Sequence, residues 1–289
     1  MSQNQTGQAW LEKVADILQQ GLGSAFKAGG EPGKQLKNFL NGVWFGHPLH
    51  PAMTDIPVGC WMLGTTLDLI YLADEKSALA SGADTALGLG ILGAVGAAAT
   101  GLTDWSDTYG KERRTGLIHA LLNTGALTAN CASWILRRRG QRKLAVLLST
   151  SAFGVASFSA YLGGELVFEL GTMVNHNAWT HGPEDWVPLM AVTDLPENAL
   201  CKAEANGTNL VLVRQAGKVY ALNETCSHAG GPLSEGQLEG ETVICPWHGS
   251  RFCLRDGKVL DGPATFKAPV YEVRERDGQI EVRLASNPN

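Results

Sequence analysis

The sequence has few charged residues for its length, and they are unevenly distributed. Charged side chains make up 18% of the 289 residues, and the formal net charge is −5. A mildly acidic balance without basic stripes gives no electrostatic footprint for nucleic acid, so a nucleic-acid partner is not expected. Charge is scarce between Asp55 and Glu165 and returns after Asp185 at the density of a soluble domain. Two domains of different character are therefore predicted.

Cysteine and export signals are also sparse. The six cysteines are too scattered to suggest a disulfide framework, so disulfides are not expected. The first residues lack the charged region, apolar core and small-residue cleavage site of a signal peptide, and no twin-arginine pair is present there. We therefore expect any export to need an internal signal.

Three long uncharged runs dominate the middle of the chain, at residues 85–103, 115–136 and 144–164. A helix rises about 1.5 Å per residue, so each run is long enough to cross a hydrocarbon core of about 30 Å. A fourth span at residues 57–73 is shorter and contains Asp68. The alternative is a soluble bundle, but soluble helices normally have a polar face and these runs do not. The sequence predicts an all-α four-helix transmembrane bundle whose two ends share a compartment.

Small residues in the second run suggest how the spans pack. Gly93, Ala97 and Gly101 recur every four residues, a spacing that lets membrane helices approach closely. Before the spans, residues 8–20 place apolar side chains on one helical face, which predicts an amphipathic helix on the protein or the membrane surface. Residues 21–42, rich in Gly and Lys, are expected to be a loose connector.

The C-terminal part has the pattern of a small all-β domain. Short apolar runs are separated by turn residues, with hairpin turns expected at Gly217 and at Asp277–Gly278. The expected strands cover residues 211–213, 219–222, 242–244, 270–273 and 280–284.

Two short clusters in this domain carry metal-binding side chains. Cys226-Ser-His228 is followed by Cys245-Pro-Trp-His248. Two Cys and two His can hold zinc tetrahedrally, or a [2Fe–2S] cluster with two thiolates on one iron and two imidazoles on the other. Zinc sites usually pair Cys with Cys and His with His, whereas each cluster here gives one of each. The interleaved order favours the iron–sulfur alternative.

The segments CSHAGGPLSEG and CPWHGSRF, with the later Gly262-Pro-Ala264, resemble the Rieske family over residues 186–284. The resemblance implies that Cys226 and Cys245 hold the inner iron of a [2Fe–2S] cluster and that His228 and His248 hold the outer iron. It implies one-electron transfer as the core activity.

The sequence also departs from part of that family. Rieske proteins of quinol-oxidising complexes have an extra cysteine in each loop, where this chain has Gly231 or its neighbours and Trp247. The chain looks instead like Rieske ferredoxins and the ferredoxin-like domains that feed oxygenases. Ser250 is expected to hydrogen-bond a bridging sulfide, but Phe252 stands where a Tyr hydroxyl often donates to a ligand sulfur. Fewer donors predict a potential in the lower part of the Rieske range.

A terminal oxygenase would also need a mononuclear iron site of two His and one carboxylate. His176 and His181 have the right spacing, but Met173 stands where the carboxylate would be and no catalytic domain follows. We interpret both as linker histidines and expect no oxygenase site in this chain.

Residues 46–170 resemble a widespread bacterial four-helix membrane domain of uncharacterised function that opens with a GHPLHP-type segment. Polar residues in it are expected near the membrane face on the Rieske side. Capping is the simpler explanation for any one of them, but their gathering favours a redox-linked site for a quinone, haem or metal. Haem b would use His50 and His119 as axial ligands, and a quinone would use the same histidines with Asp104 or Glu165. The whole set is His47, His50, Asp55, Asp104, His119, Asn123 and Glu165.

Together these observations predict a membrane-anchored electron-transfer protein that exchanges single electrons with a redox protein partner, a quinone or an oxygenase. The alternatives are a redox sensor without sustained electron flow, or an electron-supplying subunit of a multi-component oxygenase. We expect a multi-pass protein of the bacterial inner membrane, in contact with the lipid bilayer. Basic residues flank its two faces almost equally. Because such clusters are generally assembled in the cytoplasm, a cytoplasmic Rieske domain is expected. The predicted parts are an N-terminal helix and connector (1–43), the membrane domain (44–171), a linker (172–185) and the Rieske domain (186–289).

Overall fold

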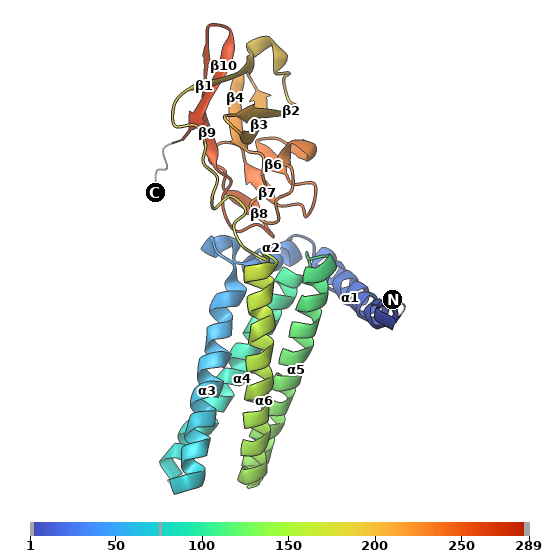
Figure 1. The fold of residues 1–289 in the computed structure, drawn as a ribbon, viewed down its shortest axis with the longest axis vertical. Helices are drawn as coiled ribbons and strands as arrows, with labels where there is room; N and C mark the ends of the chain where they lie inside the picture. The colour runs from blue at the N-terminus through green and yellow to red at the C-terminus, as the bar shows by residue number, and fades with distance from the viewer. Residues whose placement is uncertain (1–2, 75–76, 286–289) are drawn as a thin grey trace. The chain divides into compact units, whose positions relative to one another are not determined.

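The computed structural model describes residues 3–74 and 77–285. The chain divides into two compact units. One contains the residues up to Leu40 together with Pro48–Thr172, and the other contains Asn41–His47 together with everything from Met173 onward. The first unit is helical and the second is built from β-strands, as the sequence predicts (Figure 1).

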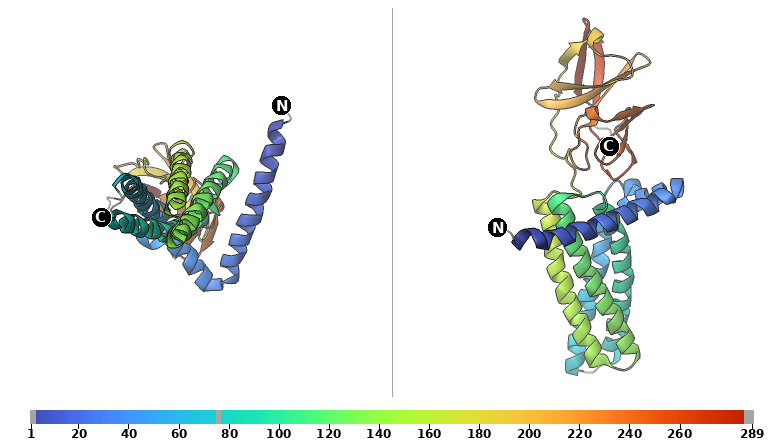
Figure 2. Two further views of the ribbon diagram at one scale, coloured as in Figure 1. Left: turned by 90° about the horizontal axis from the view of Figure 1, so that it is seen from below. Right: turned by 90° about the vertical axis from the view of Figure 1, so that its right-hand side faces the viewer.

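Four long helices form a bundle in the helical unit. Helix α3 packs on α4, α5 packs on α6, and the two pairs join through α4 with α5 and α3 with α6. In the resulting ring, α3 and α5 lie diagonally opposite, and Figure 2 shows the four helices running side by side. The bounds are α3 Leu49–Asp74, α4 Ser77–Trp105, α5 Gly110–Arg138 and α6 Arg142–Gly164.

The small residues of α4 allow the close approach that their spacing predicts. A Cβ atom on Gly90 would lie 2.3 Å from the Trp61 ring, and one on Gly93 would lie 2.5 Å from Ile56. Both partners are on α3, so side chains of α3 occupy the space that α4 leaves open. This interlocking explains why α3 and α4 make the most extensive helix contact of the bundle.

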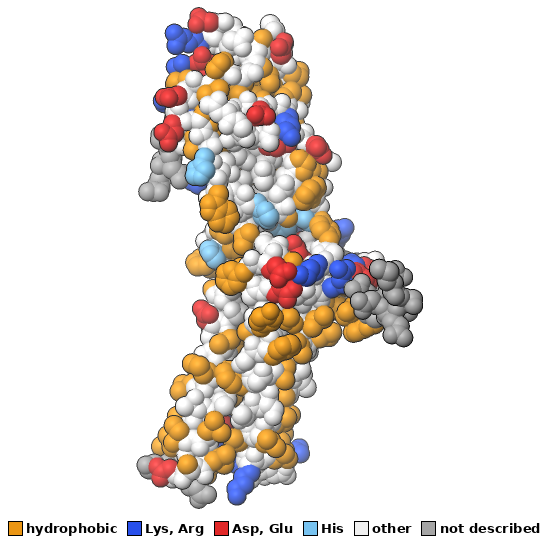
Figure 3. Space-filling model, viewed as in Figure 1, with side chains coloured by type: hydrophobic (Ala, Val, Ile, Leu, Met, Phe, Trp, Pro, Cys, Tyr) orange, Lys and Arg blue, Asp and Glu red, His pale blue; other side chains and the backbone are white. Residues whose placement is uncertain are grey.

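In the part of the chain that the structure describes, three helices are long and apolar enough to cross a membrane: Leu49–Asp74, Ala78–Trp105 and Arg142–Glu169. Helix α5, which the sequence also predicts as a span, is equally long but less apolar. Asn123 and Asn130 interrupt it, and basic residues occupy both of its ends. The visible face of the bundle is covered by apolar side chains between its ends (Figure 3). Exposed examples include Met62, Leu63, Leu92, Leu147, Phe158 and Tyr161.

The expected loose connector is wrong, because helix continues through most of it. Helix α1 covers Gln3–Ala28 and α2 covers Gly30–Asn41, with a corner at Gly29–Gly30. A Cβ atom on Gly33 would lie 2.1 Å from the Phe26 carbonyl oxygen, so these glycines permit a tight corner between two helices. Helix α1 packs against α5 and runs across the bundle helices (Figure 2).

Two antiparallel sheets make up the other unit. The larger has the order β1-β10-β9-β4-β3-β2, and the smaller has the order β5-β6-β7-β8. The predicted hairpins are confirmed: Ala216–Gly217 and Asp277–Gly278 both have positive φ angles at the turns after β3 and β9. The strands are β1 Val187–Ala191, β2 Leu200–Ala205, β3 Thr208–Gln215, β4 Lys218–Asn223, β5 Gln237–Glu239, β6 Thr242–Ile244, β7 Arg251–Cys253, β8 Val259–Asp261, β9 Val270–Arg276 and β10 Gln279–Leu284.

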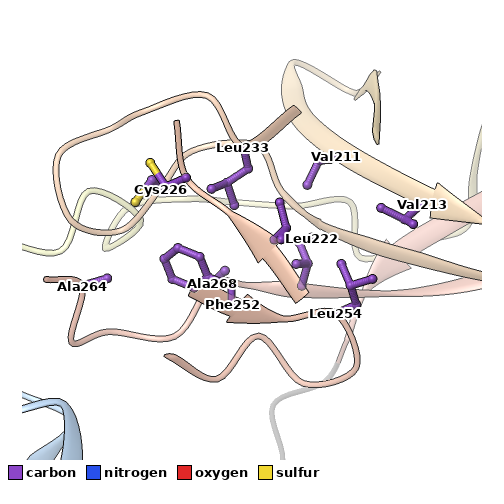
Figure 4. Close-up of a cluster of buried hydrophobic side chains, with 11 residues drawn as sticks. Val211, Val213, Leu222, Cys226, Leu233, Phe252, Leu254, Ala264 and Ala268 are labelled. Atoms are coloured by element: carbon purple, nitrogen blue, oxygen red, sulfur yellow. The ribbon is translucent and has the colours of Figure 1, made fainter. Parts of the chain in front are cut away.

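One of the two cores of this unit reaches the metal-binding motif. Phe252 and Leu222 are fully buried in it, and Cys226 lies at its edge (Figure 4); Cys245 belongs to the same cluster. The motif is therefore supported from behind by packed apolar side chains, which fix the position of its two loops.

Candidate functional site

Both cysteine–histidine clusters lie in loops attached to the smaller sheet. The first loop connects β4 to β5 and carries Cys226 and His228. The second connects β6 to β7 and carries Cys245 and His248. A third loop, between β8 and β9, contains Pro263, and we call residues 262–266 the proline loop.

The two ligand loops are closed by the same kind of turn. In the first, the Cys226 carbonyl accepts the N–H of Gly230 at 3.0 Å. In the second, the Cys245 carbonyl accepts the N–H of Gly249 at 3.1 Å. Both glycines have positive φ angles, 80° and 73°, which other residues rarely adopt. The sequence thus builds two similar cradles, each presenting one thiol.

The two thiols lie against each other and receive backbone donors. Cys226 donates to Cys245, and the N–H groups of Trp247 and His248 also point at the Cys245 sulfur. This set of hydrogen bonds lowers the pKa of Cys245 to about 7. Contact with Cys245 and burial raise the pKa of Cys226, although the N–H groups of His228 and Ala229 favour its thiolate. The donors are placed to stabilise negative charge on both sulfurs, which is the form that binds metal.

The two imidazoles form a second pair. Nδ1 of His228 lies 3.2 Å from Nδ1 of His248, and the ring centroids are 4.7 Å apart. The four predicted ligands are therefore arranged as two thiols and two imidazoles. In the described residues, no three His, Cys, Asp or Glu side chains gather as they would around one metal ion.

This two-plus-two arrangement fits a [2Fe–2S] cluster better than zinc. A structural zinc ion needs all four side chains at one point, whereas each iron of a Rieske cluster takes only two protein ligands. Position 231, beside the Cys245 thiol, has room only for glycine. A Cβ atom there would lie 2.9 Å from the Cys245 sulfur and 3.0 Å from the Trp247 ring.

Serine residues tie both ligand loops to the proline loop. Ser227 Oγ donates to the Phe266 carbonyl at 2.5 Å, and the Ala264 N–H donates to Ser250 Oγ at 3.0 Å. Because Ser250 Oγ accepts this bond, the bond does not use the hydroxyl proton of Ser250, and the donation to a bridging sulfide stays a prediction. Ser227 was not signalled by the sequence pattern, since its role depends on a loop 39 residues away.

Residues beyond the strand domain also hold the first ligand loop. Asn177 Nδ2 donates to the Thr225 carbonyl at 2.9 Å, and the His176 N–H donates to the Ser227 carbonyl at 3.1 Å. His47 stands edge-on to Phe266, with ring centroids 5.7 Å apart. Segments 41–47 and 173–177 are therefore part of the same folded unit as the candidate cluster site.

The buried carboxylate of Glu224 supports the first ligand loop. It accepts two hydrogen bonds from Ser234, and only 4% of its surface is exposed. Burial raises its pKa despite these bonds. The Ser234 contacts connect the start of the ligand loop to the turn before β5.

The polar residues predicted to gather in the helical unit separate into different environments. His50 and His119 come together, with ring centroids 6.5 Å apart, and Asn123 contacts His119. Asp104 is buried, and among the residues that the structure describes its Oδ1 has no hydrogen-bond partner. Glu165 pairs instead with Lys111 at 3.1 Å, and Asp55 is exposed.

Comparisons with known proteins agree with this geometry. Residues 185–272 match the model of the Rieske [2Fe-2S] domain, and residues 46–176 match the family described as "Predicted membrane protein (DUF2231)". The 3-phenylpropionate/cinnamic acid dioxygenase ferredoxin subunit of Escherichia coli (strain K12) is 38% identical over 94 residues, covering 32% of this chain and 88% of that protein. The chain therefore belongs to the Rieske [2Fe–2S] family, with a predicted membrane domain before the Rieske domain.

A second relative and a solved structure are also similar to part of the chain. The ferredoxin component of the naphthalene 1,2-dioxygenase/salicylate 5-hydroxylase systems of a Ralstonia species is 29% identical over 101 residues, covering 35% of this chain and 97% of that protein. A solved complex of reduced oxygenase and oxidized ferredoxin in carbazole 1,9a-dioxygenase contains a chain 30% identical, with coverages of 35% and 94% and a TM-score of 0.33. Homology to Rieske ferredoxins supports electron transfer through a Rieske cluster.

Proposed function

We propose that this protein is a membrane-anchored one-electron carrier. Cys226 and Cys245 bind the inner iron of its [2Fe–2S] cluster, and His228 and His248 bind the outer iron. The observation that carries the proposal is the paired arrangement of the four side chains, with two thiols in contact and two Nδ1 atoms 3.2 Å apart. When bound, the cluster supplies a reversible one-electron change of iron, and the chain supplies the environment.

The residues of this chain control that environment in three ways. Backbone N–H groups of both ligand loops point at the two sulfurs and stabilise their negative charge. The serine contacts to the proline loop hold the two ligand loops at a fixed separation. Trp247, which lies between Cys245 and His248, is 52% exposed and offers an apolar contact beside the ligands.

The partner we propose is a redox protein, either in the membrane or an oxygenase. The supporting observation is that the similar Escherichia coli and Ralstonia proteins are named as ferredoxin components of dioxygenase systems. The helical unit anchors the carrier in the lipid bilayer of the bacterial inner membrane, with the Rieske domain in the cytoplasm. Three helices of suitable length and composition and the match to a predicted membrane protein family support the anchoring.

Metal analysis and EPR of the purified full chain test the central proposal. We expect two irons and two labile sulfides per chain, and a reduced-state EPR spectrum with the average g value of mixed His/Cys clusters. Cys226→Ser and His248→Ala should each abolish the signal, while Cys201→Ser, on β2, should leave it unchanged. Stoichiometric zinc without sulfide would refute the assignment.

Two other functions are candidates. One is an electron-supplying subunit that works only within a multi-component oxygenase, and the other is a redox sensor that contains the same cluster. The similarity to dioxygenase ferredoxins favours the first of these. Repeated reoxidation of the reduced cluster in native membranes, without an added oxygenase, would identify an independent carrier. A cluster that changes oxidation state once and then stays reduced would identify a sensor or an isolated subunit.

We also propose that the bundle contains a redox-linked site at His50 and His119. A quinone, haem b and a metal are the occupants that the sequence suggests, and the proximity of the two imidazoles, with ring centroids 6.5 Å apart, supports a site there.

A further inference from the structure

Helix α1 is fixed to one end of the bundle. Gln19 Nε2 donates to the Trp105 carbonyl at 2.9 Å and lies 3.1 Å from the Thr108 carbonyl oxygen. Trp105 is the last residue of α4, and Thr108 lies in the connection between α4 and α5. Figure 2 shows α1 running across the bundle helices near this end. Helix α1 therefore lies at the level where these two helices meet and does not extend along them.

Ion pairs join α1 to the start of α5. Arg114 Nη1 lies 2.8 Å from Glu12 Oε1, and Arg113 Nη1 lies 2.6 Å from Asp16 Oδ1. Charged side chains are costly within the hydrocarbon of a bilayer. In a bundle that crosses a membrane, this face of α1 is therefore directed toward water.

The contacts of α1 nearer the middle of the bundle are apolar. Ala15 is fully buried in a cluster with Trp105 and Leu117, and Leu11 and Leu102 pack against this cluster. Leu102 precedes the end of α4 and Leu117 follows the start of α5, so both lie deeper in the bundle than the ion pairs. Helix α1 thus lies where charged contacts give way to apolar contacts. In a membrane protein, this is the boundary between the headgroups and the hydrocarbon.

A second apolar face of α1 does not contact the bundle. Trp10, Ile17 and Leu18 are all exposed, and Ile17 is 61% exposed. Their i, i+7, i+8 spacing places them on one face of the helix. We call these three residues the apolar strip of α1. Tryptophan is enriched at membrane–water interfaces, where its ring meets both apolar chains and polar headgroups.

The polar side chains of α1 form a separate exposed face. Lys13, Gln20 and Lys27 follow one another at intervals of seven residues, and all three are exposed. The helix therefore has one face on the bundle, one apolar face and one polar face that carries two lysines. Such a helix suits the plane of a bilayer surface, because the apolar face enters below the headgroups and the lysines reach the phosphates.

Helix α2 continues the same pattern beyond the corner. Lys37 Nζ lies 2.8 Å from Asp107 Oδ2, and Asp107 follows the end of α4. This ion pair holds α2 at the same end of the bundle as α1. Leu36 and Phe39, three residues apart on α2, are both about half exposed.

The size of the apolar strip favours lipid over a protein partner. A stable protein–protein interface buries about 800 Å² on each partner and involves roughly 20–30 residues a side. The strip has only three residues, and it lies beside the apolar surface of the bundle at the depth of a bilayer interface. We propose that α1 is an in-plane helix whose apolar strip is inserted among the phospholipids of the leaflet at this end of the bundle. This rests on the proposed anchoring of the helical unit in a bilayer.

Photo-crosslinking of the full chain in the membranes of the expressing cells tests the proposal. The photoreactive residue p-benzoylphenylalanine replaces Ile17 in one variant and Gln20 in a second, which is the matched control on the polar face. After irradiation, mass spectrometry identifies what is attached at each position. We expect phospholipid adducts at position 17 and their loss at position 20. The EPR signal of the cluster reports that each variant is folded.

A third variant with the photoreactive residue in place of Leu147, which is exposed on α6, separates this proposal from the anchoring. Phospholipid adducts at 147 but not at 17 would overturn the interfacial helix and leave the anchoring intact. Adducts of position 17 with protein, from a second copy or another chain, would also overturn it. So would equal lipid adducts at 17 and 20. Lipid adducts at none of the three positions would refute the anchoring together with the interfacial helix.

Discussion

Arg137 Nη1 donates to Asp68 Oδ1 at 2.9 Å inside the bundle, and the two side chains are only 2% and 1% exposed. Asp84 and Arg142 complete the group, with Arg142 Nη1 3.0 Å from Asp84 Oδ1. The two acids and two bases balance in charge. Asp68, which weakens the sequence-based assignment of a span at residues 57–73, is thus neutralised by Arg137 of α5.

Removing one member of this pair should destabilise the bundle strongly. Asp68→Ala leaves a buried guanidinium without its main partner, and loss of one partner of a buried ion pair typically costs about 3–5 kcal/mol. Asp84→Ala is the matched control, because Asp84 contacts the same arginines but is 36% exposed, and its loss should cost less. Unfolding in detergent by denaturant titration measures both. Equal losses for the two variants would contradict this account.

Phe252→Tyr should raise the potential of the cluster. Phe252 is fully buried beside Cys226 and Cys245. A hydroxyl there that donates to a ligand sulfur would stabilise the reduced form, and a bond of about 1 kcal/mol corresponds to on the order of 40 mV for one electron. Redox titration followed by EPR measures the shift, with Phe252→Leu as a control for packing. A folded Tyr variant with unchanged potential would show that the hydroxyl does not reach a sulfur.

Asn177→Ala should loosen the first ligand loop. Its Nδ2 bond to the Thr225 carbonyl is mostly buried, so its loss should cost about 1 kcal/mol and leave an unsatisfied acceptor next to Cys226. We expect faster loss of iron to a chelator, measured by bleaching of the cluster absorbance. Thr193→Ala, an exposed site in the same unit, is the control. Identical bleaching rates would mean that residues before 185 do not support the site.

The Rieske domain should be protected from protease in intact spheroplasts and cleaved in inverted vesicles. This follows from the proposed cytoplasmic location, since a cytoplasmic domain is enclosed by the intact inner membrane. Immunoblotting with an antibody to residues 186–289 measures the cleavage. Removal of the domain from intact spheroplasts would reverse the proposed orientation.

Strands β3, β4, β6, β9 and β10 were predictable because their signals are local, whereas β1, β2, β5, β7 and β8 were not predicted. Each hairpin turn needs a residue with a positive φ angle, and the glycines at 217 and 278 in the sequence indicate where these turns lie. The four candidate ligands were also found from spacing, since each Cys–His pair lies within a single short loop. The loose connector at residues 21–42 was predicted wrongly, because glycine at Gly29 and Gly33 serves a close helix corner there and does not break the helix.

By itself, the sequence determined the two-part organisation, the two strand hairpins and the presence of four long helices, and it indicated the candidate ligand side chains, because these depend on periodicity, turn chemistry and short spacings. The tertiary structure decided which distant residues meet. Asp68 lies opposite Arg137, Ser227 bonds the proline loop, and His50 faces His119 across the bundle. Each of these contacts depends on how helices and loops far apart in the chain pack together, and no local pattern specifies such packing.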